Sequence, residues 1–285
     1  MLIGLTIVAL GTSLPELIIN VFASIEGSTD LAIGNVLGSN IINSLLIIGV
    51  AATIYPISMV GKKSANDVWF SLFVTVALLV LANFTSFQNG VPYINRIDAL
   101  IFTLILAGFL YYSFFKGGAL VQESSKTELK EIKTRWSVIL IIVGIVGLYL
   151  GGKWIVSGAS QIASDLNISQ SAIGMTIIAA ATSLPELVTS ILAAMKKNTD
   201  MAVGNAIGSN IFNILLVLGV SAFISPIPFD VKMNIEIYIL LASTLLILLF
   251  IKFDIGKTKK AISKIEGILL ITAYILFLIY SLTKV

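Results

Sequence analysis

The sequence TSLPEL at residues 12–17 returns unchanged at residues 182–187. Working outward from it, residues 2–56 align with residues 172–226 at a constant offset of 170 without a gap, and 29 of the 55 aligned positions are identical. The polar residues keep their register along with the apolar ones, which chance similarity between apolar segments does not explain. The chain therefore contains an internal duplication, and both copies place this motif in an equivalent position.

The composition of the chain indicates that it lies in a membrane. Of the 285 residues, 57% are hydrophobic and only 12% are charged, whereas soluble domains carry about 25% charged residues. The apolar residues form runs close to the ~20 residues needed to cross a bilayer. Because backbone groups in lipid must be satisfied within each segment, these runs are predicted to be helices. The predicted fold class is an all-α integral membrane protein.

Polar and helix-breaking clusters divide the chain into nine predicted spans. A charged stretch in the middle separates two halves: a first repeat at 1–115, a connector at 116–136 and a second repeat at 137–285. The predicted spans are 2–24, 31–54, 68–84, 97–115, 137–157, 171–194, 201–224, 234–251 and 265–283.

The duplication also predicts the orientation of the two halves. The second copy is preceded by the apolar run 137–157, and the offset places its counterpart before residue 1, so we expect two five-helix repeats of which the first lacks its opening helix. An odd number of helices inverts one repeat relative to the other, as in many secondary transporters. The turn with Glu26 and Asp30 matches a turn with Lys196 and Lys197. Since basic residues favour the cytoplasm, these matching turns are predicted on opposite sides, with the connector cytoplasmic; 14 of the 18 basic residues then lie inside.

Glu16 and Glu186 are the central candidates for function. An acidic side chain at the bilayer centre costs roughly 2.5–3.5 kcal/mol even on lenient insertion scales, and here it occurs at both equivalent positions. Pro15 and Pro185 kink each helix and free a backbone carbonyl, which a cation could satisfy. The alternative is a plain kink with each Glu bonded to a neighbouring helix. Two hydroxyl residues precede each Glu at helical spacing, so their oxygens share its face: Thr12, Ser13, Thr182 and Ser183.

The next apolar run of each copy supplies amide and hydroxyl oxygens at a spacing of four. Gly34 and Gly38, with their counterparts in the second copy, permit close helix approach. Amides that only join helices are the alternative role for these residues; Asn40 and Asn210 lie on a different face and are the weakest candidates. The face contains Asn35, Ser39 and Asn43 in the first copy, and Asn205, Ser209 and Asn213 in the second.

The sequence has no Cys and no His, so an ion site must be built from oxygen, which suits Ca²⁺, Na⁺ or Mg²⁺. Ca²⁺ takes six to eight oxygen ligands, and two carboxylates would neutralise its charge. An empty site would leave two like charges together, so Na⁺ or H⁺ must refill it. That requirement favours exchange over leak. Three further acidic residues near predicted helix ends are expected to be structural and interfacial: Asp98, Glu236 and Glu266.

At these motifs the chain resembles the calcium/cation antiporter superfamily, specifically its prokaryotic sodium/calcium exchangers. The similarity rests on residues 11–16, 34–40, 179–187 and 204–213 and extends over essentially the whole chain. It implies alternating access and one Ca²⁺ exchanged for several Na⁺, with no enzymatic activity and no cofactor. Carried over residue by residue, the metal ligands fall on Thr12, Ser13, Glu16, Ser39 and Asn43, on Thr182, Ser183, Glu186, Ser209 and Asn213, and on the backbone oxygens of Ala9 and Ala179.

The chain departs from the family pattern at Asn213, where many relatives have Asp, and at Ala181, where Gly is usual. Two carboxylates rather than three leave the stoichiometry open and argue against the K⁺-dependent subtype. Ca²⁺/H⁺ antiport through the same two Glu residues is the alternative function; an intramembrane protease or a channel is remote. We expect a monomer in the cell membrane whose partners are Ca²⁺, Na⁺ and the lipid bilayer, without nucleic acid.

Overall fold

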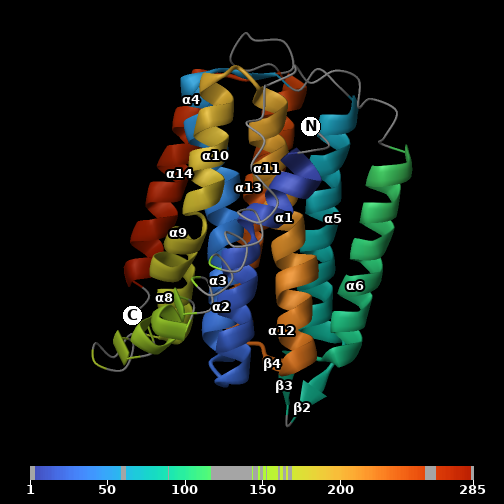
Figure 1. Cartoon of the computed structure of the whole chain (residues 1–285), viewed down its shortest axis with the longest axis vertical. Coiled ribbons are helices and arrows are strands. Elements are labelled where there is room, and N and C mark those ends of the chain that lie inside the picture. Colours follow the sequence, from blue (N-terminus) through green and yellow to red (C-terminus); the bar gives the residue numbers. More distant parts are fainter. Residues whose placement is uncertain are drawn as a thin grey trace.

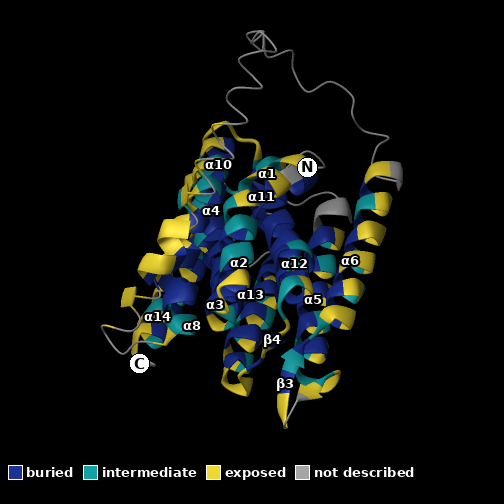
Figure 2. Cartoon of the chain, turned by 60° about the horizontal axis from the view of Figure 1, so that its bottom comes forward, coloured by how far each residue is buried: buried dark blue, intermediate teal, exposed yellow. Residues whose placement is uncertain are grey.

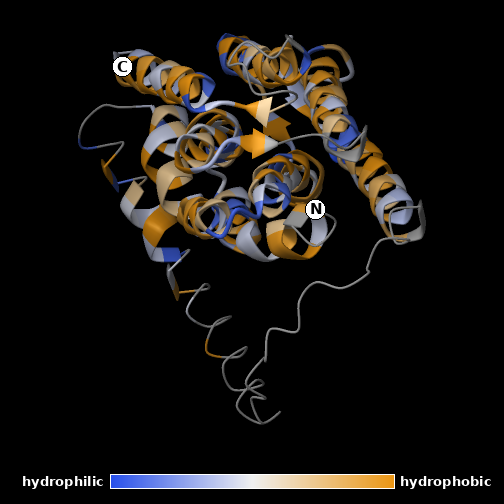
Figure 3. Ribbon diagram, turned by 90° about the horizontal axis from the view of Figure 1, so that it is seen from above, coloured by the Kyte–Doolittle hydropathy of each residue, from blue (hydrophilic) through white to orange (hydrophobic). Residues whose placement is uncertain are grey.

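The computed structural model describes residues 4–58, 62–88, 90–116, 169–253 and 261–283, together with scattered positions between 143 and 165. Its helices run along one axis as a bundle (Figure 1). Exposed residues lie mainly on the outside of the bundle and buried residues in its interior (Figure 2). Seen from above, hydrophobic residues occupy the outer surfaces of the helices as well (Figure 3), as expected for a protein surrounded by lipid.

Within the described residues, six helices are long and apolar enough to cross a membrane, and two bent helix pairs pass the same test together. These eight segments correspond to eight of the nine predicted spans; the ninth, 137–157, falls largely outside the described residues. The all-α membrane fold is therefore confirmed, whereas the count of nine spans in two five-helix repeats stays a prediction. The first half contains α1 (Ala9–Thr12), α2 (Leu14–Ile25), α3 (Thr29–Ile41), α4 (Ile48–Ile54), α5 (Lys62–Phe84) and α6 (Arg96–Tyr111).

The second half repeats this order of elements. Both halves contain π-helical segments, which the apolar periodicity did not predict: η1 (Gly4–Val8), η2 (Ile42–Ile47) and η3 (Tyr112–Lys116) in the first, η5 (Gly174–Ile178) and η6 (Asn213–Leu218) in the second. The other helices of the second half are α8 (Gln170–Ile173), α9 (Ala179–Thr182), α10 (Leu184–Met195), α11 (Thr199–Phe212), α12 (Gly219–Ile224), the 3₁₀ turn η7 (Val231–Met233), α13 (Asn234–Phe253) and α14 (Lys264–Thr283).

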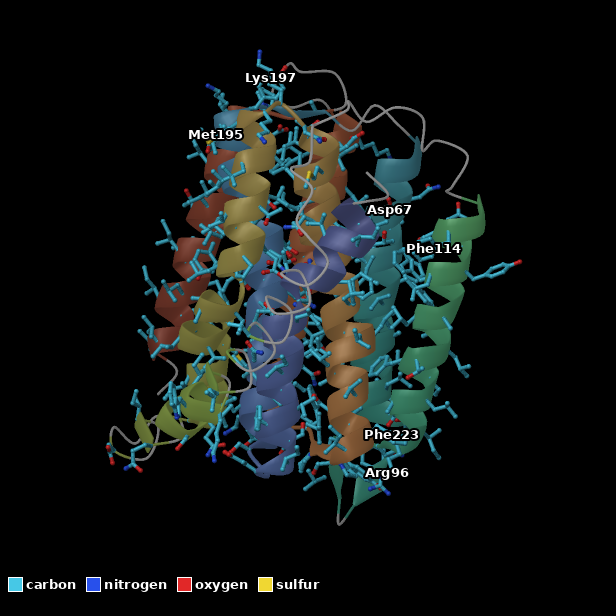
Figure 4. The ribbon with its side chains drawn as sticks, viewed as in Figure 1. Asp67, Arg96, Phe114, Met195, Lys197 and Phe223 are labelled. Carbon is cyan, nitrogen blue, oxygen red and sulfur yellow. The ribbon has the colours of Figure 1, made fainter. Side chains whose placement is uncertain are left out.

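The equivalent helices α2 and α10 run in opposite directions from the middle of the bundle (Figure 1). Figure 4 places Met195 and Lys197, at the end of α10, at one end of the bundle, and Arg96 and Phe223 at the other. The turns after α2 and α10 share their form: Gly27 has φ 77° and Lys197 has φ 58°. This arrangement of the described helices is the one expected of inverted copies.

Short antiparallel strands close both ends of the bundle. At one end β1 (Ile57–Ser58) pairs with β5 (Ala261–Ile262); at the other, β2 (Phe87–Gln88), β3 (Val91–Ile94) and β4 (Ile227–Pro228) form a three-stranded sheet. These strands tie segments of the first half to segments of the second.

Asp98, Glu236 and Glu266, predicted to be structural and interfacial residues, each lie in the first turn of a helix and are only 1% exposed. Two of them satisfy backbone groups at helix starts. Asp98 accepts from the Asn95 backbone N–H at 2.8 Å, within a capping box. Glu266 Oε2 likewise accepts from the Ser263 backbone N–H at 2.6 Å. Their position near helix ends was predicted correctly, but helix packing covers these ends.

Candidate ion site

Each repeated motif lies at a break in a transmembrane helix. Residues 5–12 and α2 meet at a bend of 47°, and Gln170–Thr182 meets α10 at a bend of 45°. Ser13 and Ser183 occupy the breaks with nearly identical backbone angles, φ −81° ψ 4° and φ −79° ψ 2°. A proline begins the helix after each break, as its missing N–H allows. The predicted kinks are therefore confirmed in both copies.

Glu16 and Glu186 are both 0% exposed, in the first turn of α2 and of α10. The two acidic residues lie in one region, because Ser13, three residues before Glu16, reaches Glu186 Oε1. Neither oxygen of Glu16 has a hydrogen-bond partner among the described residues, whereas Glu186 Oε1 accepts from Ser209 Oγ at 3.2 Å and Ser13 Oγ at 3.5 Å. The paired acidic groups thus share one buried region and do not face lipid.

The hydroxyl residues of each copy reach across to the other copy. Thr12 Oγ1 lies 3.4 Å from Ser209 Oγ, and Thr182 Oγ1 lies 3.3 Å from Ser39 Oγ. Because equivalent pairs form in both directions, the oxygen-rich region is built jointly by the two copies. In Figure 4, oxygen atoms gather near the middle of the bundle, midway between its two ends.

Asn43 and Asn213 complete the predicted set from the start of η2 and η6, where π-helical turns, which are often found at functional sites, interrupt the long helices. Both are 0% exposed, and neither their side-chain oxygen nor their nitrogen has a partner in the described part of the chain. The Ala9 and Ala179 carbonyls accept from the Ser13 and Ser183 backbone N–H groups at 3.0 Å. The hydroxyls of Thr12 and Thr182 lie 3.3 Å from the same two oxygens.

Five of the predicted ligands have buried side-chain oxygens without a hydrogen-bond partner among the described residues, although such oxygens also occur outside the set, at Asn40 and Asn210 for example. Leaving a buried polar group unpaired costs ~1–3 kcal/mol, so such a concentration needs a physical reason, and a cation bound among these oxygens supplies one. Within the described residues, no group of three or more His, Cys, Asp or Glu could hold a metal; a cation here would rely on two carboxylates and neutral oxygens. The buried oxygens without partners in this region belong to Glu16, Glu186, Asn43, Asn213 and Ser183.

A cavity of about 110 Å³ adjoins this region at Thr182. Its lining includes Pro15, Ala181 and Thr182, as well as Gly151 and Ile155 of the segment before α8. The weakest sequence candidates lie elsewhere, as predicted: Asn40 Nδ2 donates to the Asn210 carbonyl at 3.3 Å, and Asn210 Nδ2 donates to Ser44 Oγ at 2.8 Å. Asn35 and Asn205 lie behind the region, where each hydrogen-bonds a threonine of the opposite copy.

Broken transmembrane helices in duplicated halves, with acidic groups at the breaks, define the architecture of a secondary transporter. The chain belongs to the sodium/calcium exchanger protein family, whose model matches residues 1–115 and 136–283. Members of this family are transporters and not enzymes, so this chain is a multi-pass membrane protein that exchanges cations.

Named relatives agree with this assignment. The chain is 30% identical over 313 residues to the sodium/calcium exchanger MaX1 of Methanosarcina acetivorans, covering 97% of this chain and 87% of the relative. It is 36% identical over 282 residues to the putative antiporter CaxA of Alkalimonas amylolytica, covering 96% and 86%. Among solved structures, the sodium-calcium exchanger NCX_Mj soaked with 100 mM Na⁺ and 10 mM Sr²⁺ matches with a TM-score of 0.70 and 32% identity, over 96% of this chain and 84% of that one.

Proposed function

We propose that this exchanger moves Ca²⁺ across the membrane in return for Na⁺ by alternating access, and that the twelve ligand residues implied by the family resemblance hold the ions. The observation that carries the proposal is the pair Glu16 and Glu186: two fully buried carboxylates at matching helix breaks, among buried oxygens that have no hydrogen-bond partners in the described residues. Two carboxylates match the charge of one Ca²⁺, and the hydroxyl, amide and carbonyl oxygens bring the ligand number into its range of six to eight.

The same pair supports exchange over leak. When Ca²⁺ leaves, two buried negative charges remain near one another, and each loses its counter-charge in a low-dielectric setting. Na⁺ relieves this repulsion if it binds before the site turns to the other side. The names of the relatives MaX1 and NCX_Mj, both sodium/calcium exchangers, favour Na⁺ as that ion.

Flux measurements on the reconstituted chain separate Na⁺ from H⁺ as the driving ion. We expect proteoliposomes loaded with Na⁺ and diluted into Na⁺-free buffer at equal pH to take up Ca²⁺, and uptake to stop when the Na⁺ gradient is removed. Uptake that follows a pH gradient in Na⁺-free buffers would instead assign Ca²⁺/H⁺ antiport. Failure of both gradients to drive uptake would contradict exchange altogether.

We also propose that the chain lies in the cell membrane with the connector at 116–136 in the cytoplasm. The support is the basic turn at Lys196, which matches the acidic turn at Glu26 in the other copy; both side chains are exposed. Because the sequence has no Cys, single cysteines give an unambiguous test. In sealed right-side-out membranes, we expect an impermeant thiol reagent to label Glu26→Cys and to leave Lys196→Cys unlabelled until the membrane is opened. The opposite pattern would invert the topology, and equal labelling would contradict the inverted arrangement.

A further inference from the structure

Side chains next to the candidate ion site form two series of hydrogen bonds, one in each copy; each series is called a hydrogen-bond chain. In the first, Asn20 Nδ2 donates to the Ala32 carbonyl at 2.9 Å, and Asn35 Nδ2 donates to Asn20 Oδ1 at 2.7 Å. The chain ends across the copy boundary, where Thr182 Oγ1 donates to Asn35 Oδ1 at 3.2 Å. A backbone carbonyl of α3 is thereby connected to a predicted ligand on α9.

The second copy forms the same chain with a different residue at one position. Ser190 Oγ donates to the Ala202 carbonyl at 3.2 Å, Asn205 Nδ2 donates to Ser190 Oγ at 3.1 Å, and Thr12 Oγ1 donates to Asn205 Oδ1 at 3.2 Å. Ser190 occupies the position equivalent to Asn20. The same place in the hydrogen-bond pattern is therefore filled by an amide in one copy and by a hydroxyl in the other. All four intermediate side chains are 0% exposed: Asn20, Asn35, Ser190 and Asn205.

The direction of both chains is fixed by their anchored ends. A backbone carbonyl can only accept a hydrogen bond, so Asn20 must present its nitrogen to Ala32. Its oxygen then faces Asn35, which must present its nitrogen in turn, and the oxygen of Asn35 is left for Thr182. The same reasoning fixes Ser190 and Asn205, so each chain ends in an amide oxygen that accepts from the threonine of the opposite copy. Ser39 Oγ, at 3.5 Å, is a second and longer donor to the oxygen of Asn35.

This direction decides a competition at each threonine. The hydroxyl of Thr182 has one proton and several acceptors within reach: Asn35 Oδ1 at 3.2 Å, its own copy's Ala179 carbonyl at 3.3 Å and Ser39 Oγ at 3.3 Å. Thr12 faces the same choice among Asn205 Oδ1 at 3.2 Å, the Ala9 carbonyl at 3.3 Å and Ser209 Oγ at 3.4 Å. When the threonine donates its proton to the asparagine oxygen, the alanine carbonyl does not receive that hydrogen bond. The lone pairs of the threonine hydroxyl then remain available as well.

We propose that Asn20, Asn35, Ser190 and Asn205 are positioning residues that turn the protons of Thr12 and Thr182 away from the transported cation. The hydroxyls and the Ala9 and Ala179 carbonyls then meet the cation as acceptors. This inference rests on the proposed ion site and assigns the residues that set its polarity. Outer-shell hydrogen bonds of this kind orient the ligands that touch the metal.

The residue difference between the copies provides a matched pair of variants. Asn20→Ser installs the residue that completes the chain in the second copy, and Asn20→Ala differs from it by a single oxygen. In Na⁺-driven uptake by the full chain, we expect Asn20→Ala and Ser190→Ala to raise the half-saturating Ca²⁺ concentration by ~10-fold. Asn20→Ser should stay within ~3-fold of the wild type, because it can still accept from Asn35 and donate to Ala32. The maximal rate at saturating Ca²⁺ should change by less than ~2-fold in all three, since the site can still fill.

The comparison separates positioning from packing. Asn20→Ser and Asn20→Ala remove nearly the same volume, so an equal rise in half-saturation for both would assign the effect to packing and overturn the inference. Unchanged half-saturation in Asn20→Ala and Ser190→Ala would overturn it as well. A wild-type protein that takes up no Ca²⁺ under either gradient would instead refute the proposed function, and the positioning role with it.

Discussion

Glu16→Gln and Glu186→Gln are each expected to abolish Ca²⁺ flux. Both carboxylates are 0% exposed, so water does little to screen their attraction for a bound cation. At an effective dielectric of about 20, one unit charge 4 Å from another is worth ~4 kcal/mol, or about a thousandfold in affinity, and more toward a divalent ion. Glutamine keeps the size and one oxygen but removes that charge. Initial rates of Ca²⁺ uptake in Na⁺-loaded proteoliposomes measure the loss.

The glutamine variants should retain their fold. Removing one of two neighbouring buried charges relieves repulsion in the ion-free protein, so its melting temperature in detergent should stay unchanged or rise. Asn40→Ala provides a control at similar depth, because Asn40 bonds to the Asn210 backbone away from the site; its flux should fall only mildly. Normal flux in both glutamine variants would refute the site assignment.

The duplication made most of this site predictable from the sequence. Glu16 and Glu186 were recognisable because an acidic residue within an apolar run is costly, and the offset of 170 showed that the cost is incurred twice. Helical periodicity placed Asn43 on the face of Ser39, and the structure buries both. The kink at Pro15 followed from its missing N–H. Each of these predictions depends on local sequence alone, and each applies to an equivalent residue in both copies.

Features that depend on contacts between helices in the folded bundle were not predicted. Asn20 and Ser190 differ in identity, so the alignment gave no sign that they fill the same role, which depends on distances to Ala32 and Ala202. The π-helical turns at the start of η2 and η6 leave no periodicity signal, since apolar residues fill every face. The burial of Glu266 depends on packing at a helix end that only the folded bundle creates.

Gly38→Ala and Gly208→Ala are expected to damage both stability and transport. A Cβ at Gly38 would lie 2.3 Å from the carbonyl oxygen of Met175 and 2.8 Å from the Cβ of Ala179. At Gly208 it would lie 2.5 Å from the Leu5 carbonyl oxygen and 2.7 Å from the Ala9 Cβ. The obstacles are mainly backbone atoms, so whole helices must separate; overpacking of this kind typically costs ~1–3 kcal/mol.

The same displacement should reach the ion site. Ala9 and Ala179 are predicted to offer their carbonyl oxygens to the cation, and they are the residues that the new methyl groups would push away. We therefore expect Ca²⁺ uptake to fall at least ~10-fold in each variant, together with a lower melting temperature in detergent. Gly108→Ala is the matched control: Gly108 lies within α6 with nothing within 4 Å of an added Cβ, so its replacement should leave flux unchanged and stabilise the helix by up to ~1 kcal/mol. If Gly38→Ala and Gly208→Ala behaved like this control, α3 and α11 would not cross η5 and η1 at these glycines, and the ion site would lose the close helix contact that holds its two halves together.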